Sequence, residues 1–240
     1  MPILAERGYV IPAVGEVYEA CANQLADSIR QFHPNANITI LTRNQLPHGD
    51  LGGYANDWQV FRASPYRQTI KLEADMLIAG PIEHWWTMFE HRDIVVSTGC
   101  RDFYGNTATS RYYRKFIDDN YLPDVYNAIT YWRLSATAQE FFDLVRSIFE
   151  HWADYKQLVK FPEDVPSTDF VYAMAAQIIG PERVTMPFAT YPNIVHMKRH
   201  IIGTNTNDWT QELVWELDPL RIQTVAQWGA FHYQVKDWLV

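Results

Sequence analysis

The sequence predicts a mixed α/β fold, in which helices flank a central and mostly parallel sheet. The chain opens with an apolar stretch over residues 8–14, an amphipathic helix and a second strand over residues 37–42. Two strands joined by a helix are normally parallel, with a right-handed crossover. Further strand-like and helical segments follow without an internal repeat, a low-complexity tract or a linker. We therefore expect a single domain over residues 1–240.

Each element is predicted from its own local pattern. The first helix has apolar residues three or four positions apart and ends before Pro34. Thr137 and Glu140 have the spacing of a capping box at the start of a later helix. Ser167 is the expected N-cap of a last helix over residues 169–179. The other predicted segments are a short helix at 58–63, strands at 68–74, 94–97 and 126–132, a long loop at 99–120, and an irregular region beyond residue 187.

Composition and charge exclude several classes of protein. Hydrophobic residues make up 48% of the chain and charged residues 20%, a balance typical of globular proteins rather than disordered ones. The net charge of −8 argues against broad, non-specific binding of nucleic acid. Cys21 and Cys100 give no disulfide framework. The N-terminus lacks a signal-peptide pattern, and no apolar run approaches the ~20 residues of a spanning helix. We expect a cytoplasmic protein without membrane contact.

Two carboxylates interrupt the stretch TIKLEADMLI, residues 69–78, which otherwise has the character of a buried strand. On one strand, Glu73 and Asp75 would point to the same face, ~6–7 Å apart at their Cα atoms. Ionised carboxylates are costly to bury unless they are paired or bind a cation. Hard oxygen ligands at this end of a strand favour Mg²⁺ or Mn²⁺, held partly by substrate phosphates. Spacing alone leaves open a solvated turn that carries both residues.

The surrounding residues, SPYRQTIKLEADMLI (64–78), resemble a segment of GT-A fold nucleotide-sugar glycosyltransferases, in particular the glycogenin-like and galactosyltransferase-like group. In that group a strand ends in Leu-Asp-Ala-Asp-Met-Leu-Val, and a Gly-x-Ile turn and an aromatic helix follow; GPIEHWW (80–86) takes that place here. The resemblance implies a GT-A fold, with Asp75 on the metal and the donor diphosphate. Glu73, where an Asp is usual, is implied to contact the donor ribose or to share the metal.

The opening strand and helix also resemble the nucleotide-binding start of this family. There, the end of the first strand and the following turn cradle the donor base, which implies that role for Pro12, Ala13, Val14 and Tyr18. Ordinary packing is the alternative for these residues. Arg67 resembles a basic residue that approaches the donor, and its alternative is a structural role on the surface.

Two later segments match the family less closely. DVYNAI (124–129) resembles a Phe-Asn-Ser-Gly strand whose Asn faces the donor and acceptor sugars, which implies that role for Asn127, although the Gly is missing. PSTDF (166–170) resembles the start of an Asp-Gln-Asp helix, which implies that Asp169 lies near the reacting sugar. Its alternative is electrostatic stabilisation of a helix N-terminus, where acidic residues are favoured.

Two His/Lys pairs compete for the family's final element, His-Phe-x-Gly-x-x-Lys-Pro-Trp. FHYQVKDW (231–238) keeps the His, an aromatic residue, the Lys and the Trp in order, without the Gly. We prefer His232 as a metal ligand and Lys236 as the partner of the diphosphate. VHMK (195–198) supplies the second pair, and we expect His196 and Lys198 to face the donor or acceptor, with His196 as the alternative metal ligand.

Together these features predict a glycosyltransferase, transferring a hexose or pentose, that requires Mn²⁺ or Mg²⁺. It would move the sugar from a nucleoside diphosphate donor to a hydroxyl acceptor, with the retention of configuration that the resemblance implies. The sequence also resembles short glycosyltransferases of tailed phages, some of which modify hydroxymethylated cytosine in DNA. The expected acceptor is therefore a saccharide or a modified DNA base, and a phage protein would act in the host cytoplasm.

Basic and aromatic residues between 101 and 115 suit a DNA acceptor, whereas the acidic net charge favours a solvated loop there. Two other functions use the same features. A nucleotidyltransferase or a sugar-nucleotide hydrolase would use the same carboxylates, and a non-catalytic carbohydrate-binding protein would use the Trp and Tyr faces.

Overall fold

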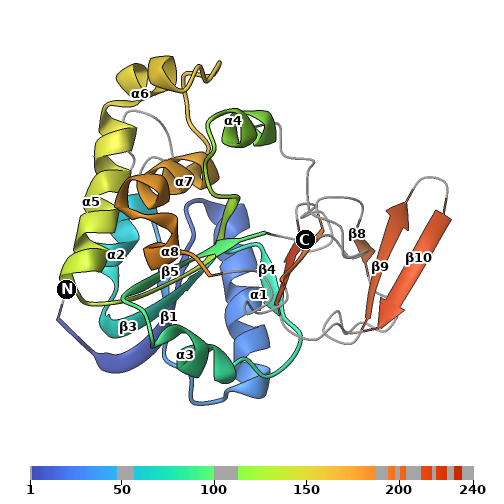
Figure 1. The fold of residues 1–240 in the computed structure, drawn as a ribbon. Coiled ribbons are helices and arrows are strands. Elements are labelled where there is room, and N and C mark those ends of the chain that lie inside the picture. Colours follow the sequence, from blue (N-terminus) through green and yellow to red (C-terminus); the bar gives the residue numbers. More distant parts are fainter. Residues whose placement is uncertain are drawn as a thin grey trace.

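A five-stranded sheet with helices on both sides forms the centre of the molecule (Figure 1). The computed structural model describes residues 2–47, 57–99 and 113–186 and the strands at 194–197, 201–203, 212–217, 220–225 and 230–233. The sheet has the strand order β2-β1-β3-β6-β5. Its strands are β1 (Ala5–Pro12), β2 (Ile38–Leu41), β3 (Tyr66–Leu72), β5 (Ile94–Thr98) and β6 (Val125–Arg133).

Four of these five strands run in the same direction. β1 pairs in parallel with both β2 and β3, and β6 pairs antiparallel with both β3 and β5. Helix α1 (Glu16–Phe32) connects β1 to β2, so the chain opens with a β-α-β unit. The predicted mixed fold with a mostly parallel central sheet is confirmed.

The helices cover the two faces of the sheet, and the strand residues alternate between them. Tyr9 and Ile11 pack in a core cluster with α1 and α3 (His84–Phe89), whereas Val10 packs in the cluster on the other face. That second cluster contains residues of α2 (Val60–Ala63), α5 (Ala136–Glu150) and α7 (Thr168–Ile179). Because helices cover both faces, eight of the nine residues of β6 are buried.

The helices after β6 differ in detail from the sequence prediction. Ser135 is the N-cap of α5, and its Oγ accepts a hydrogen bond from the backbone N–H of Ala138. The capping box predicted from Thr137 and Glu140 is therefore wrong, because the N-cap lies two positions earlier, at Ser135, and the helix begins at Ala136. α7 follows Ser167, as predicted, but the Ser167 side chain makes no capping bond. The remaining helices are α4 (Arg114–Asp119), inside the predicted loop, α6 (Trp152–Leu158) and α8 (Pro181–Val184).

Ser135→Ala is expected to lower the free energy of unfolding by about 1 kcal/mol, because the substitution removes the side-chain acceptor at the helix N-terminus. Urea denaturation followed by circular dichroism measures the change. Glu140→Ala, on the exposed side of the same helix turn, is expected to change stability by less than about 0.5 kcal/mol. A larger loss of stability in Glu140→Ala than in Ser135→Ala would support the capping box instead.

The chain beyond Pro187 was expected to be irregular, but the part that the structure describes contains five strands. β11 (Ala230–Tyr233) lies between β4 (Met76–Ile78), antiparallel to it, and β7 (Ile194–Met197), parallel to it. A separate antiparallel sheet, drawn at the right of Figure 1, contains β8 (Ile201–Gly203), β9 (Glu212–Leu217) and β10 (Leu220–Val225). Among the described residues, no helix has the length and apolar character needed to cross a bilayer.

Candidate metal site

The stretch TIKLEADMLI forms two strands rather than one. β3 ends at Leu72, a turn covers residues 74–75, and β4 begins at Met76 in a different sheet. The prediction of one strand is therefore wrong, although the side chains of Glu73 and Asp75 do converge. The break has a physical cause: the backbone N–H of Glu73 still bonds to Ala128 of β6, whereas the residues from Met76 onward pair with β11. The two carboxylates lie at a turn, as in the alternative considered above, but this turn is only partly exposed to solvent.

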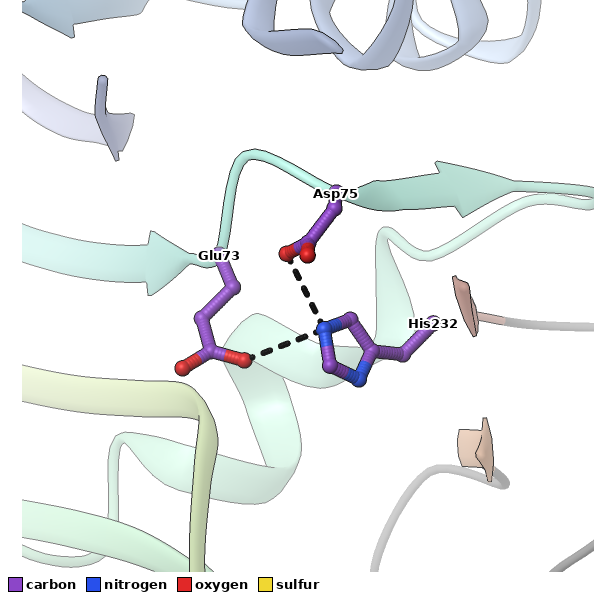
Figure 2. A group of neighbouring side chains, drawn as sticks. All are labelled: Glu73, Asp75 and His232. Atoms are coloured by element: carbon purple, nitrogen blue, oxygen red, sulfur yellow. Dashed lines mark hydrogen bonds and ion pairs between the residues drawn. The ribbon is translucent and has the colours of Figure 1, made fainter. Parts of the chain in front are cut away.

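Nε2 of His232, on β11, faces both carboxylates (Figure 2). Its Nε2 atom is 3.0 Å from Oδ1 of Asp75 and 3.3 Å from Oε2 of Glu73. The side chain of Asp75 is 15% exposed and that of Glu73 is 30% exposed. One ligand atom from each of the three residues lies within 4.8 Å of the other two, and this group could hold a metal ion. The cluster joins residues that are 157 positions apart in the chain.

Burial raises the pKa of Glu73 from its ordinary value to about 7. His232 opposes this shift because a protonated imidazole favours the ionised carboxylate, and Asp75 adds to it because two neighbouring negative charges repel. Glu73 is thus a carboxyl group that a neighbouring cation would help to ionise.

This pKa gives the metal-free protein a specific pH dependence. Because the folded-state pKa of Glu73 lies above its unfolded value, the folded state binds more protons between about pH 4.5 and 7. The contribution of Glu73 to stability is therefore expected to fall as the pH rises through this window. In buffer containing EDTA, Glu73→Gln should become increasingly more stable than the wild type between pH 5 and pH 8, as measured by urea denaturation. A constant difference between the two proteins would contradict the raised pKa.

A second polar group lies buried beside the first, centred on Asp57. Oδ2 of Asp57 is 2.9 Å from Nζ of Lys71, and it also accepts hydrogen bonds from Nδ2 of Asn127 at 3.0 Å and the hydroxyl of Tyr172 at 2.7 Å. The side chain of Lys71 is only 1% exposed. Thr130 donates to the other end of the Asn127 amide, Oδ1, at 2.7 Å. The side chain of Asn127 is therefore fixed on both sides.

Asp169 links this polar group to the start of α7. Its Oδ1 atom accepts a hydrogen bond from the backbone N–H of Asn127 at 2.7 Å, and its Oδ2 atom accepts one from the hydroxyl of Tyr113. Ala128, the next residue after Asn127, accepts a hydrogen bond from the backbone N–H of Glu73, so Asp169 lies near the carboxylate cluster. The structure thus brings Asp169, Asn127, Glu73, Asp75 and His232 to one edge of the sheet.

The residues predicted to cradle the base lie at the same edge. β1 ends at Pro12, and the β1–β3 register, with Val10 opposite Lys71, places this end next to Glu73. Ala13 is buried and its N–H donates to Leu41, whereas Val14 and Tyr18 are partly exposed and pack against the core clusters.

Arg67 does not join the site. It lies near the start of β3, six residues before Glu73, so about 20 Å of extended chain separates it from the carboxylates. Its guanidinium is 3.6 Å from Glu6 on the surface. Arg67 and the carboxylates therefore lie at opposite ends of β3, and the approach of Arg67 to the donor stays a prediction.

The backbone of His196 pairs with that of His232, because β7 lies beside β11. Lys198 and Lys236 lie outside the described residues, as do residues 101–112 of the predicted basic and aromatic stretch. Asp57 and Lys71 were not among the site residues predicted from the sequence. Only Lys71 gave a signal, as a lysine inside the apolar part of TIKLEADMLI.

Comparison with solved structures gives matches of low sequence identity. LgtC, a galactosyltransferase solved with donor and acceptor sugar analogs, has 13% identity and a TM-score of 0.47, over 94% of this chain and 86% of that chain. GlyE of Streptococcus pneumoniae has 8% identity and a TM-score of 0.46, over 77% and 46%. WbbM, a bifunctional enzyme, has 9% identity and a TM-score of 0.49, over 82% and 41%. All three are glycosyltransferases.

This chain spans less than half the length of the GlyE and WbbM chains. The sequence matches no protein-family model and no curated protein sequence.

Proposed function

We propose that this protein is a metal-dependent glycosyltransferase of the GT-A type that uses a nucleoside diphosphate sugar as donor. The observation that carries the proposal is the convergence of Glu73, Asp75 and His232 at the edge of the sheet where β1 and β3 end. In open α/β sheets, ligands bind outside the carboxyl ends of the strands. The cluster lies at that position, next to the turn that follows β1.

The three side chains fit a hard divalent cation. Two carboxylates and one imidazole are ligands that Mn²⁺ accepts, and Mg²⁺ binds the carboxylates in the same way. Adjacent ligands of an octahedral ion with bonds of about 2.1 Å are about 3 Å apart. The separations of 3.0 and 3.3 Å from His232 Nε2 to the carboxylate oxygens agree with this value. When bound, the cation would neutralise charge that develops on the leaving diphosphate.

In the proposal, other residues at this edge of the sheet bind the nucleoside, the diphosphate and the transferred sugar. The turn from Pro12 to Val14, with Tyr18, receives the nucleoside, and Lys236 or Lys198 neutralises the diphosphate. Asp169 and Asn127 face the transferred sugar, and both are held by hydrogen bonds within the protein, so they are fixed before a ligand arrives. Retention of configuration is part of the proposal. The acceptor is a saccharide hydroxyl or a hydroxymethylated base in DNA, the latter if the protein is of phage origin.

The test is to incubate the protein with Mn²⁺ and a panel of nucleotide sugars, with and without oligosaccharides and hydroxymethylcytosine-containing DNA. Release of a nucleoside diphosphate, abolished by EDTA and restored by Mn²⁺, is the expected result. Release of pyrophosphate or a sugar phosphate would instead indicate a nucleotidyltransferase or a sugar-nucleotide hydrolase. Sugar binding without metal and without turnover would indicate a carbohydrate-binding protein.

A further inference from the structure

His232 forms polar contacts through both of its ring nitrogens. Nε2 faces Asp75 and Glu73 (Figure 2), and Nδ1 shares a hydrogen bond with the hydroxyl of Tyr126. Tyr126 belongs to β6 of the central sheet, whereas His232 belongs to β11 of the sheet that contains β4 and β7. The contact between the Tyr126 hydroxyl and Nδ1 therefore joins the two sheets at the candidate metal site.

Both side chains are buried, which fixes the orientation of the imidazole. Tyr126 is 3% exposed and His232 is 7% exposed. Their rings pack edge to face, with centroids 5.6 Å apart and an interplanar angle of 63°. A rotation of the imidazole would break a buried hydrogen bond and this ring contact together, so Tyr126 holds the ring with Nε2 toward the carboxylates.

The chemistry of a neutral imidazole gives the hydroxyl a second role. One ring nitrogen carries a proton and the other a lone pair, and a cation can bind only the lone pair. Binding through Nε2 therefore requires the proton on Nδ1, where the phenolic oxygen of Tyr126 would accept its hydrogen bond. In the other tautomer, Nε2–H donates to Asp75 or Glu73 and the Tyr126 hydroxyl donates to Nδ1. A hydroxyl serves both tautomers because it can donate and accept.

We propose that Tyr126 is a positioning residue for the metal site, whose hydroxyl orients His232 and accepts from Nδ1–H when Nε2 binds a cation. This inference rests on the proposed function, because it takes Nε2 of His232 as a ligand of the metal. A purely structural role of the Tyr126 ring would not require the hydroxyl.

Tyr126→Phe tests the inference, because it keeps the ring and removes only the hydroxyl. Removing a hydrogen-bond partner of a metal ligand typically lowers metal affinity 10- to 100-fold. We expect the Kd for Mn²⁺, measured from the electron paramagnetic resonance signal of the free ion, to rise by about that factor. Tyr66→Phe is the matched control: its buried hydroxyl bonds to Thr39 at 2.7 Å, near the opposite end of β3. This variant should lose a similar amount of stability and keep the Kd of the wild type.

A double-mutant cycle with His232→Ala shows whether the hydroxyl acts through the imidazole. In the His232→Ala background, Tyr126→Phe should cause no further change in the Kd for Mn²⁺. An unchanged Kd in Tyr126→Phe, or an equal loss in both backgrounds, overturns the inference and leaves the proposed function standing. Failure of the wild-type protein to bind Mn²⁺ overturns both. If Tyr126→Phe does not fold, 3-fluorotyrosine at position 126 keeps the hydroxyl but weakens it as an acceptor. A smaller rise in Kd is then expected, and no rise counts against the inference.

Discussion

Asp75→Ala is expected to abolish metal-dependent release of nucleoside diphosphate, lowering kcat/KM by at least about a hundredfold. The side chain of Asp75 is the less exposed of the two acidic side chains in the cluster, at 15%. Its Oδ1 atom lies 3.0 Å from Nε2 of His232. A metal ion that neutralises a leaving diphosphate stabilises the transition state by several kcal/mol. Each 1.36 kcal/mol of activation free energy corresponds to a factor of ten in rate. Without Asp75, one carboxylate and one imidazole remain to hold that ion.

The measurement combines turnover with metal binding. We expect the variant to require a much higher Mn²⁺ concentration for half-maximal rate and to show weaker Mn²⁺ binding by isothermal titration calorimetry. Asp27→Ala is a matched control, because it removes an exposed carboxylate of α1 whose partner is Arg30, and it should keep wild-type activity. Circular dichroism in EDTA verifies that both variants fold. Wild-type turnover in Asp75→Ala would contradict the proposed metal site.

Asp57→Ala is expected to lower the free energy of unfolding by about 3–5 kcal/mol, the largest effect on stability that we expect from one polar substitution here. The change leaves the ammonium group of Lys71 buried without its carboxylate partner, at 1% exposure. It also removes the acceptor of the Tyr172 hydroxyl and of the Asn127 amide. An unpaired charge in the interior is costly because water cannot solvate it.

Urea denaturation of a double-mutant cycle measures this effect. Lys71→Met removes the cation, so the double variant Asp57→Ala/Lys71→Met should recover part of the stability that Asp57→Ala loses. The pair between Arg62 and Asp143 is a control with the same geometry on the surface, at 3.0 Å and with side chains 53% and 50% exposed. Asp143→Ala should cost less than about 1 kcal/mol. Equal losses in Asp57→Ala and Asp143→Ala would show that burial of the pair has no energetic consequence.

The elements of the central sheet and their order along the chain were predictable because each has a strong local pattern. The apolar stripe of the first helix and the strands on either side indicated the β-α-β opening, and Gly180-Pro181 marked the end of α7. The start of α5 was harder to predict, because Ser135 and Thr137 are both good capping residues and the choice depends on backbone geometry. The resemblance pointed to Glu73 and Asp75 without showing how they meet.

The break between β3 and β4 could not be predicted from TIKLEADMLI. An apolar stretch pairs equally well as one strand or two, because backbone hydrogen bonds do not depend on side chains. The partners decide, and here they are β6 before the turn and β11 after it. The same holds for Asp57, which precedes α2 and meets Lys71 only because the chain folds back over the end of β3.

By itself, the sequence determined the periodicity of each helix and strand and the chemical character of its carboxylates, because these depend on residues close together in the chain. Only the tertiary structure decided which imidazole faces Glu73 and Asp75. His232 reaches them because β11 pairs with β4, a contact across more than 150 positions that no local pattern specifies. Strand pairing is set by burial and by the geometry of the whole sheet, and so the candidate metal site exists only in the folded protein.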